Sequence, residues 1–199
     1  MSTKNNSSRR QFLLKTITAG SLLGLGCPKL LASARTPGVF EESSDEAVVE
    51  TLRFILTNNI GIYKGLEKEL GSEKLIKMLQ QITADNWAVG IKEMTKDIKE
   101  RNIENYAKLI ASFMSSTPYS TVLKYEITHQ DDKVLEIKYT KCLFAEIFRE
   151  MNAADIGWAL ECSAGNTVAK IYNPDMKFSN PKNLMKGDSF CIERFELKA

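Results

Sequence analysis

Residues 122–139 read VLKYEITHQDDKVLEIKY, and this stretch decides the class of fold. In each half, every second residue is apolar and the residues between them are mostly charged. Such alternation indicates a half-buried β-strand, because successive side chains of a strand point to opposite faces. Gln130-Asp131-Asp132 supplies turn residues between the halves. The stretch therefore predicts an antiparallel hairpin with strands at 122–128 and 134–139.

The sequence before this hairpin has a helical pattern. Apolar residues recur at spacings of three and four from Val48 to Leu70, and Ser43-Ser44-Asp45-Glu46 is typical of a helix start. A second pattern of this kind covers 75–98, and we expect a break in it near 83–86. A third pattern covers 103–114. The sequence thus predicts a helical N-terminal half.

Shorter elements follow the hairpin. We expect helices at about 142–151 and 154–162, then strands at 168–172 and 190–197, joined by connections rich in Pro and Asn. Helices first and an antiparallel sheet with two short helices afterwards is the pattern of an α+β domain. The predicted fold class is therefore α+β.

Residues 1–34 have the three parts of a twin-arginine export signal. A polar head contains Arg9-Arg10, a weakly apolar run covers 16–25, and Ala32-Ser33-Ala34 provides small residues for cleavage. The apolar run is too short to span a bilayer, which requires roughly 20 apolar residues. Cleavage after Ala34 is favoured, and lipid attachment at Cys27 is the alternative.

Removal of this signal leaves a linker at 35–43 and one α+β domain at 44–199. The signal holds five of the 27 Lys and Arg residues and none of the 25 acidic residues, so 22 basic residues face 25 acidic ones in the remainder. This balance does not favour a nucleic-acid partner. We expect a periplasmic protein that meets the twin-arginine export machinery, binds a small molecule and has no stable membrane span after processing.

Cys142, Cys162 and Cys191 remain after cleavage. Their separations match no zinc-finger spacing, so one disulfide with a free thiol, three thiols for chemistry, and a metal site all stay open. Cys142 begins a predicted helix, whose N-terminal N–H groups lower the pKa of a thiol. It is therefore a candidate nucleophile, unless it is simply a small buried side chain.

His129 is the single histidine, and we expect it at the exposed edge of the hairpin turn. A Ser-His-Asp triad would have to use it, and the sequence has no Gly-x-Ser-x-Gly elbow to accompany it. One histidine also excludes a histidine-rich metal centre. The sequence has no Gly-rich loop of the nucleotide-binding kind either.

Several motifs between Tyr139 and Phe195 follow one another in a characteristic order. They are Cys142 with Ala145-Glu146-Ile147-Phe148, Asp155-Ile156-Gly157, Cys162, Tyr172-Asn173-Pro174, and Leu184-Met185-Lys186-Gly187-Asp188-Ser189-Phe190-Cys191. In order and spacing, this part of the chain resembles the L-2-amino-thiazoline-4-carboxylic acid hydrolase family. The resemblance implies an α+β fold with a helical N-terminal part.

The resemblance also implies an activity and a set of site residues. The activity is hydrolytic opening of a cyclic amidine-like C–N bond, giving a carbamoyl-cysteine product in the name-giving member, and no cofactor is implied. Cys142, Cys162, Cys191 and Asp188 are the positions that match the family pattern. The pattern also has an Asp three residues after the second Cys, where this sequence has Gly165.

Three functions remain open from the sequence. The first is a hydrolase, in which Cys142 attacks as a thiolate or a polar cluster activates water, Asp188 orients substrate or water, and Cys162 and Cys191 line the pocket. The second is a non-catalytic extracytoplasmic binding or sensing domain. The third is a metal or redox site that uses the three thiolates.

Overall fold

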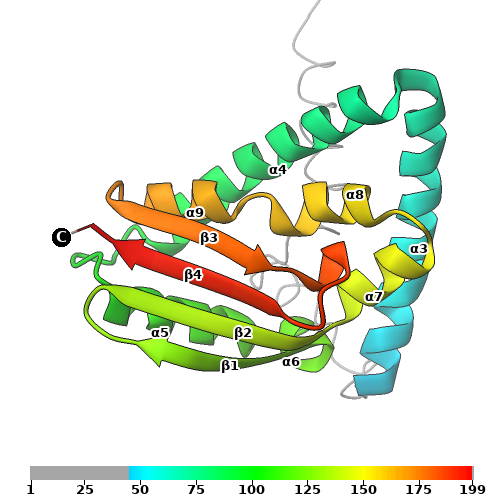
Figure 1. Ribbon diagram of the computed structural model, residues 1–199. Coiled ribbons are helices and arrows are strands. Elements are labelled where there is room, and N and C mark those ends of the chain that lie inside the picture. The colour runs from blue at the N-terminus through cyan, green and yellow to red at the C-terminus, as the bar shows by residue number, and fades with distance from the viewer. Residues whose placement is uncertain (1–44, 199) are drawn as a thin grey trace, which may run out of the picture. The chain divides into compact units, whose positions relative to one another are not determined.

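The computed structural model describes residues 45–198, and these residues have an α+β fold (Figure 1). Helices α3 to α6 come first, and a four-stranded antiparallel sheet with further helices follows. The predicted signal at 1–34, the linker at 35–43 and the predicted cap at Ser43-Ser44 lie outside the described residues.

Two long helices open the described part. α3 (Asp45–Leu70) and α4 (Ser72–Met94) meet at Gly71, whose φ of 80° is a conformation that glycine adopts without steric cost. The predicted break near 83–86 is wrong, because α4 continues through it. Of the polar residues there, Thr83 is buried in the helix packing and Asp85 is exposed, where its Oδ1 accepts a hydrogen bond of 2.9 Å from Gln81 Nε2. Within residues 45–198, no helix is long and apolar enough to cross a membrane.

The third predicted helix is confirmed as α5 (Ile103–Met114). Asn102 caps it, because its side chain accepts a hydrogen bond of 2.9 Å from the backbone N–H of Asn105. One further turn of helix, α6 (Tyr119–Val122), leads directly into the sheet.

The sheet has the order β1-β2-β4-β3 and all neighbouring strands are antiparallel. The predicted hairpin is confirmed as β1 (Leu123–Gln130) and β2 (Val134–Cys142), and the predicted last strand is confirmed as β4 (Cys191–Leu197). In the hairpin turn, Asp131 Oδ1 accepts hydrogen bonds of 2.8 Å from two backbone N–H groups, those of Lys133 and Val134.

Two predictions between the hairpin and β4 are wrong. The residues predicted as a strand at 168–172 belong to helix α9 (Gly165–Tyr172), and the edge strand β3 (Met176–Lys182) lies where we expected an irregular connection. A short apolar run fits a strand and a helix equally well. Pro181 is tolerated in β3 because it lies at a register shift of an edge strand.

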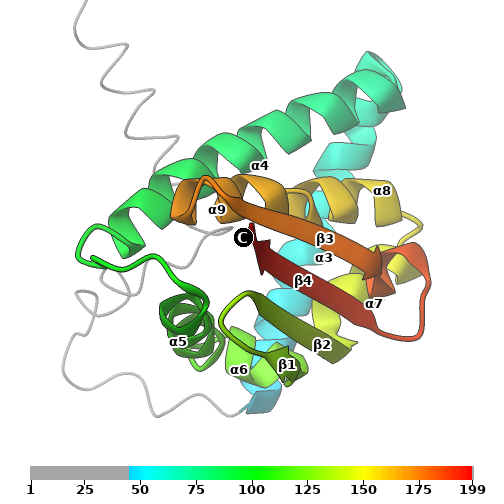
Figure 2. The same cartoon turned by 60° about the vertical axis from the view of Figure 1, so that its left-hand side comes forward.

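The predicted helices after β2 are confirmed, with one local difference. α7 (Leu143–Glu150) and α8 (Ala154–Gly157) are α-helical, whereas the segment after α8, η1 (Trp158–Cys162), is a π-helix. A short 3₁₀ turn, η2 (Leu184–Lys186), precedes β4. Figures 1 and 2 show α5 and α9 on the same face of the sheet.

Buried apolar side chains form two clusters. The first lies among α3, α4, α7 and α8, and the second lies between the sheet and α5, α9 and the end of α4. Leu123 packs against both clusters. Cys142 and Cys162 pack against the first cluster and Cys191 packs against the second, so the three predicted cysteines lie along the border between them.

Candidate active site

The register of β2 against β4 brings two polar side chains to the covered face of the sheet. Ile137 pairs with Glu193 and Tyr139 pairs with Cys191. Residues that are directly opposite in an antiparallel pair share a face, and Ile137 and Tyr139 are buried, as is Phe195 two residues after Glu193. Glu193 is therefore a carboxyl group on the inner face of a central strand.

Two tyrosine hydroxyls lie near the carboxyl group of Glu193. Burial raises the pKa of Glu193, and the Tyr139 hydroxyl, which donates a hydrogen bond of 3.0 Å to its Oε2, acts in the opposite direction. Burial raises the pKa of Tyr106 well above its ordinary value, and the charge of Glu193 adds to this effect. Among the described residues, the Tyr106 hydroxyl is a buried polar atom without a hydrogen-bond partner.

Glu161 lies in the π-helical segment η1, beside Cys162. Burial raises the pKa of its carboxyl group to about 7, although the residue as a whole is exposed. Its charge also contributes to the raised pKa values of Tyr63 and Tyr119. Short π-helical segments are frequent at functional sites.

The three cysteines are free and half-buried. The charge of Cys142 contributes to the raised pKa of Cys162, and that of Cys191 contributes to the raised pKa of Cys142, so the three thiols are close enough to interact. We call Cys142, Cys162, Cys191, Glu161 and Glu193 the acid–thiol cluster. Its members come from β2, η1 and β4, which are far apart in the sequence.

The expected lowering of the pKa of Cys142 is wrong. Burial raises the pKa of Cys142 to about 12, and the backbone N–H groups of Ala145 and Phe144 in the first turn of α7 only partly oppose this effect. Burial also raises the pKa of Cys191 to about 11, although the backbone N–H of Leu184 donates a hydrogen bond of 3.0 Å to its Sγ. At neutral pH these thiols are protonated, so none of them is an activated nucleophile.

Asp188 and Asn183 shape the loop that carries Cys191. Asp188 Oδ2 accepts a hydrogen bond of 2.7 Å from the backbone N–H of Asn183, and the charge of Asp188 contributes to the raised pKa of Cys191. The Asn183 side chain is buried, accepts a hydrogen bond of 2.7 Å from the backbone N–H of Met185, and also hydrogen-bonds to Cys162, which partly opposes the rise in the pKa of that thiol. The structure thus places Asp188 beside the cluster, with one oxygen engaged in the loop.

Gly165 begins α9 and faces the ring of Phe178 on β3. A Cβ atom at position 165 would lie 2.4 Å from two carbon atoms of that ring, which is far inside van der Waals contact. No larger side chain fits there unless Phe178 moves. The carboxylate that the resemblance implies at this position is therefore absent, and the Phe178 ring fills the space.

The structure also shows where His129 lies and whether side chains gather as metal ligands. His129 Nε2 lies 2.8 Å from Asp131 Oδ2 in the exposed part of the hairpin, as its position in the sequence predicts. Residues 45–198 contain no group of three or more His, Cys, Asp and Glu side chains placed to hold a metal ion.

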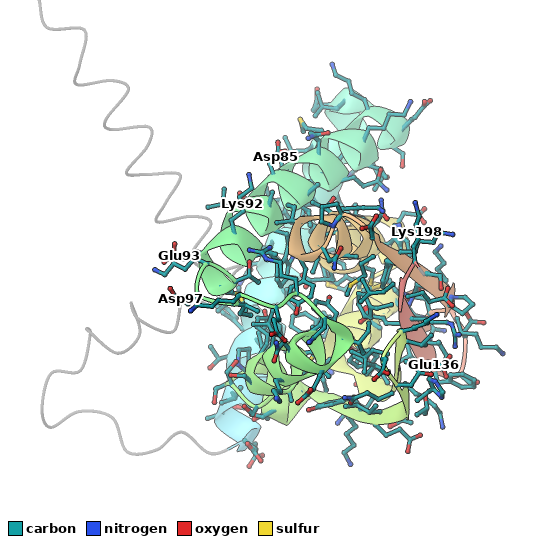
Figure 3. All side chains as sticks on the ribbon, turned by 90° about the vertical axis from the view of Figure 1, so that its left-hand side faces the viewer. Asp85, Lys92, Glu93, Asp97, Glu136 and Lys198 are labelled. Atoms are coloured by element: carbon teal, nitrogen blue, oxygen red, sulfur yellow. The ribbon has the colours of Figure 1, made fainter. Side chains whose placement is uncertain are left out.

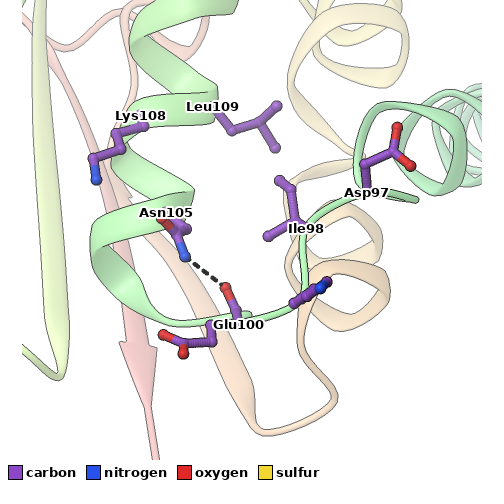
Figure 4. A pocket seen from close by; sticks show the side chains of 7 residues that line it. Asp97, Ile98, Glu100, Asn105, Lys108 and Leu109 are labelled. Carbon is purple, nitrogen blue, oxygen red and sulfur yellow. Dashed lines mark hydrogen bonds between the residues drawn. The ribbon is translucent and has the colours of Figure 1, made fainter.

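Two surface depressions lie outside the acid–thiol cluster. Figure 4 shows the first, of about 540 Å³, where Asn105 Nδ2 donates a hydrogen bond of 2.9 Å to the backbone oxygen of Glu100. The second, of about 490 Å³, lies between α4 and η1. Neither contains a member of the cluster. The first is lined by Asp97, Ile98, Lys99, Glu100, Asn105, Lys108 and Leu109, and the second by Lys77, Gln80, Gln81, Ala84, Trp158 and Ser163.

Glu161 and Glu193 were not among the predicted site residues. In the sequence, Glu161 ends the otherwise apolar run Trp158-Ala159-Leu160, and Glu193 shares its strand face with Cys191 and Phe195. A carboxyl group on the apolar face of an element is the signal that would have identified both.

Comparison with known families agrees with the motifs in the sequence. The family model described as L-2-amino-thiazoline-4-carboxylic acid hydrolase matches residues 48–195, which include the acid–thiol cluster and nearly all of the described helices and strands. A search of the curated proteins found no match. Because the family model covers most of the sequence, the chain belongs to the L-2-amino-thiazoline-4-carboxylic acid hydrolase family.

Proposed function

We propose that the protein is a hydrolase that opens a C–N bond in a small cyclic amidine. The observation that carries this proposal is the pair of carboxyl groups, Glu161 and Glu193, beside three thiols at the border between two apolar clusters. Perturbed carboxyl groups in a sheltered position are typical of acid–base catalysis. The family membership supports a hydrolytic reaction. That the substrate is a cyclic amidine is our inference.

Glu161 has the properties of a general base and acid. With a pKa of about 7, its carboxyl group is partly ionised at neutral pH and exchanges a proton readily. As a carboxylate it accepts a proton from a water molecule whose oxygen bonds to the amidine carbon. As a carboxylic acid it returns that proton to the ring nitrogen when the C–N bond of the tetrahedral intermediate breaks. The hydroxyl proton that remains on the former water oxygen passes to solvent as the carbonyl group forms, so an amidinium ring and water give a carbonyl group, an amine and one proton.

Cys142 has a different role in this mechanism from the one first expected. Its raised pKa of about 12 makes direct attack by a thiolate costly, because the proton must first pass to a weaker base such as Glu161. We therefore propose that water is the nucleophile and that the three thiols line the site.

Turnover of 2-amino-thiazoline-4-carboxylate and related cyclic amidines by the purified protein tests this function. Glu161→Gln keeps the shape of the side chain and removes the titratable group, so we expect turnover to fall by at least about a hundredfold. Glu69→Gln, at an exposed position of α3, is the matched control and should leave turnover unchanged. Equal turnover of wild type and Glu161→Gln rejects the acid–base role.

A non-catalytic binding or sensing domain is the second candidate, and position 165 favours it. The resemblance to the family implies an Asp at this position, but the chain has Gly165, and the ring of Phe178 occupies the space where the Asp side chain would lie. Gly165→Asp alone would collide with that ring, so the informative variant is Gly165→Asp combined with Phe178→Ala. Hydrolysis gained only by the double variant supports this candidate, whereas robust hydrolysis by the natural protein rejects it.

We also propose that the protein acts in the periplasm after twin-arginine export, with lipid attachment at Cys27 as the alternative. The support is the sequence of residues 1–34 alone. A three-thiolate metal or redox site is the third candidate, and among residues 45–198 no group of three or more His, Cys, Asp and Glu side chains is placed to hold a metal ion.

A further inference from the structure

The two edge strands of the sheet differ in how their free edges are protected. β1 and β3 are the outer strands, because the strand order is β1-β2-β4-β3. An edge strand leaves a row of backbone N–H and C=O groups unpaired, and Pro or a bulge commonly protects it. β3 has Pro181 at its register shift. β1 contains neither Pro nor Gly, and Figure 1 shows no described helix or strand beyond it.

β1 offers an uninterrupted stretch of backbone along this free edge. Its register against β2 shifts twice, and the first shift passes over Thr140, so the extra residue belongs to β2. The second shift passes over Thr128, so the extra residue there belongs to β1. A bulge bends the strand that contains it and interrupts regular pairing. β1 is therefore regular from Leu123 to Ile127, and Tyr125 is the middle residue of this stretch.

The inner face of this stretch is apolar and only partly covered. Tyr125 and Ile127 pair with Tyr139 and Ile137 of β2, which are buried, so all four side chains share the face of the sheet that α5 covers. Nevertheless, Tyr125 is 36% exposed and Ile127 is 43% exposed. A further strand beside β1 would bring side chains against both of them and reduce this exposure.

The outer face of β1 carries a basic side chain that lacks an acidic partner. Glu126 forms an ion pair of 2.8 Å with Lys138 of β2, and Figure 3 shows Glu136, two residues before Lys138, on the side of the sheet away from α5. Lys124 shares this outer face and lies opposite Lys141 of β2. Like charges directly opposite each other destabilise a strand pair. Within residues 45–198, neither of these two lysines forms an ion pair.

We propose that two copies of this chain associate through β1, by antiparallel pairing of the two β1 strands around a twofold axis at Tyr125. In this register Leu123 lies opposite Ile127 of the second copy, so the whole uninterrupted stretch is paired and the inner faces of both sheets stay on one side. Lys124 lies opposite Glu126 of the second copy, and the reverse pair forms as well. Each copy thus supplies the acidic side chain that Lys124 lacks.

The neighbouring registers bring like charges together. An axis at Glu126 places this carboxylate directly opposite its own copy, and it also brings the bulge residue Thr128 into the paired stretch. An axis at Lys124 places two ammonium groups directly opposite each other. Charge complementarity and the length of the uninterrupted stretch therefore select the same register.

Sedimentation velocity of the purified protein over a concentration series tests the proposal. We expect a dimer with a dissociation constant in the micromolar range, because one strand from each copy makes a small interface. Lys124→Glu and Glu126→Lys each place like charges opposite each other across the axis, so each variant alone should dimerise at least about tenfold more weakly. An equimolar mixture of the two variants should regain dimerisation, because opposite charges then face each other in the mixed dimer.

Lys177→Glu is the matched control, because it makes the same charge change at an exposed position of the other edge strand, β3, and should leave dimerisation unchanged. A protein that is monomeric over the whole series overturns the proposal. Unchanged dimerisation of Lys124→Glu, or no gain when the two variants are mixed, also overturns it, because the copies would then meet elsewhere.

Cross-linking gives a reading that does not depend on the charge variants. Tyr125→Cys should form a disulfide-linked dimer on mild oxidation, beyond any formed by the wild type, because the two copies of this residue lie opposite each other at the axis. Ile127→Cys should not, because its counterpart lies further along the strand pair. Equal cross-linking of both variants, or none of Tyr125→Cys, contradicts the proposed register.

Discussion

Glu161 is the residue on which the proposed chemistry depends. Burial raises the pKa of its carboxyl group from the ordinary value of 4.5 to about 7. Near neutral pH the group can therefore accept a proton and return it. Burial also raises the pKa of Glu193, but the hydrogen bond from the Tyr139 hydroxyl partly opposes this rise. Two carboxyl groups in different surroundings can take different roles, because their surroundings set different pKa values.

The pKa of Glu161 predicts how the rate depends on pH. If the carboxylate is the base, kcat of the wild type should rise with pH and level off above about pH 7. The pH–rate profile of Glu161→Gln should lose this inflection, whereas that of Glu69→Gln should keep it. An inflection that is still present in Glu161→Gln would assign the titration to another group.

The same pKa predicts an effect on stability. The folded carboxyl has a pKa above its ordinary value of 4.5, so between these values the folded state binds more protons than the unfolded state and stability falls as pH rises. Glu161→Gln removes the titrating carboxyl group and therefore removes its contribution to the fall in stability at higher pH. Its Tm relative to wild type should therefore be higher at pH 8 than at pH 4.5, as measured by thermal unfolding at both pH values. A constant difference contradicts the shift.

The thiols should be unreactive in the folded protein. Burial raises the pKa of Cys142 to about 12 and that of Cys191 to about 11, so the thiolate that reacts with iodoacetamide is scarce at pH 7.5. We expect alkylation of the native protein to be at least roughly a hundredfold slower than in denaturant, where the pKa values are ordinary. Fast labelling of Cys142 under native conditions would restore the thiolate mechanism.

The elements around the site differ in how well the sequence predicts them. The hairpin was predictable, because both halves of residues 122–139 alternate and Asp131 supports the turn between them through its side chain. Helix α9 was not, because its buried residues Val168, Ala169 and Tyr172 fit one helical face and also one short strand. The π-helical form of η1 depends on tertiary packing, which a local pattern does not report.

The candidate site was predictable only in part. The order of the motifs identifies Cys142, Cys162 and Cys191, and the alternation in β4 places Glu193 on the same strand face as Cys191. Which face of the sheet the helices cover depends on contacts between distant segments, so the alternation alone does not show that this face is buried. The sequence left open whether Cys142 is an activated thiol or a small buried side chain, and only the tertiary packing shows that burial outweighs the N-terminus of α7.

The contact between α9 and β3 can be tested at Gly165. Gly165→Ala places a Cβ atom against the Phe178 ring, so we expect a loss of about 1–3 kcal/mol in the free energy of unfolding in urea. Phe178→Leu should recover part of that loss in the double variant, because it removes the ring atoms that the Cβ would meet. Equal losses in the presence and absence of Phe178 would show that the two positions are not in contact.

At the scale of the whole molecule, the acid–thiol cluster lies where two apolar clusters meet. The first cluster belongs to the helices and the second to the sheet with α5 and α9, so a polar site at their border can be enclosed without interrupting either core. Active and binding sites commonly lie at such borders between packed units. The family match includes both clusters, which is consistent with one site built by the whole domain.

Export can be tested with the full chain. Replacing Arg9 and Arg10 together by Lys keeps the charge and removes the twin-arginine pair, so we expect the protein to remain in the cytoplasm. Cell fractionation followed by immunoblotting measures this. Lys4→Arg is the matched control and should leave export unchanged. Periplasmic protein in the double Lys variant would contradict the twin-arginine route.

The most direct test of the account is the titration of Glu161 itself. In a protein labelled with ¹³C at the glutamate carboxyl groups, the signal that Glu161→Gln removes should titrate with a midpoint of about 7. A midpoint at the ordinary value of 4.5 would contradict the sheltered carboxyl group and, with it, the proposed acid–base chemistry.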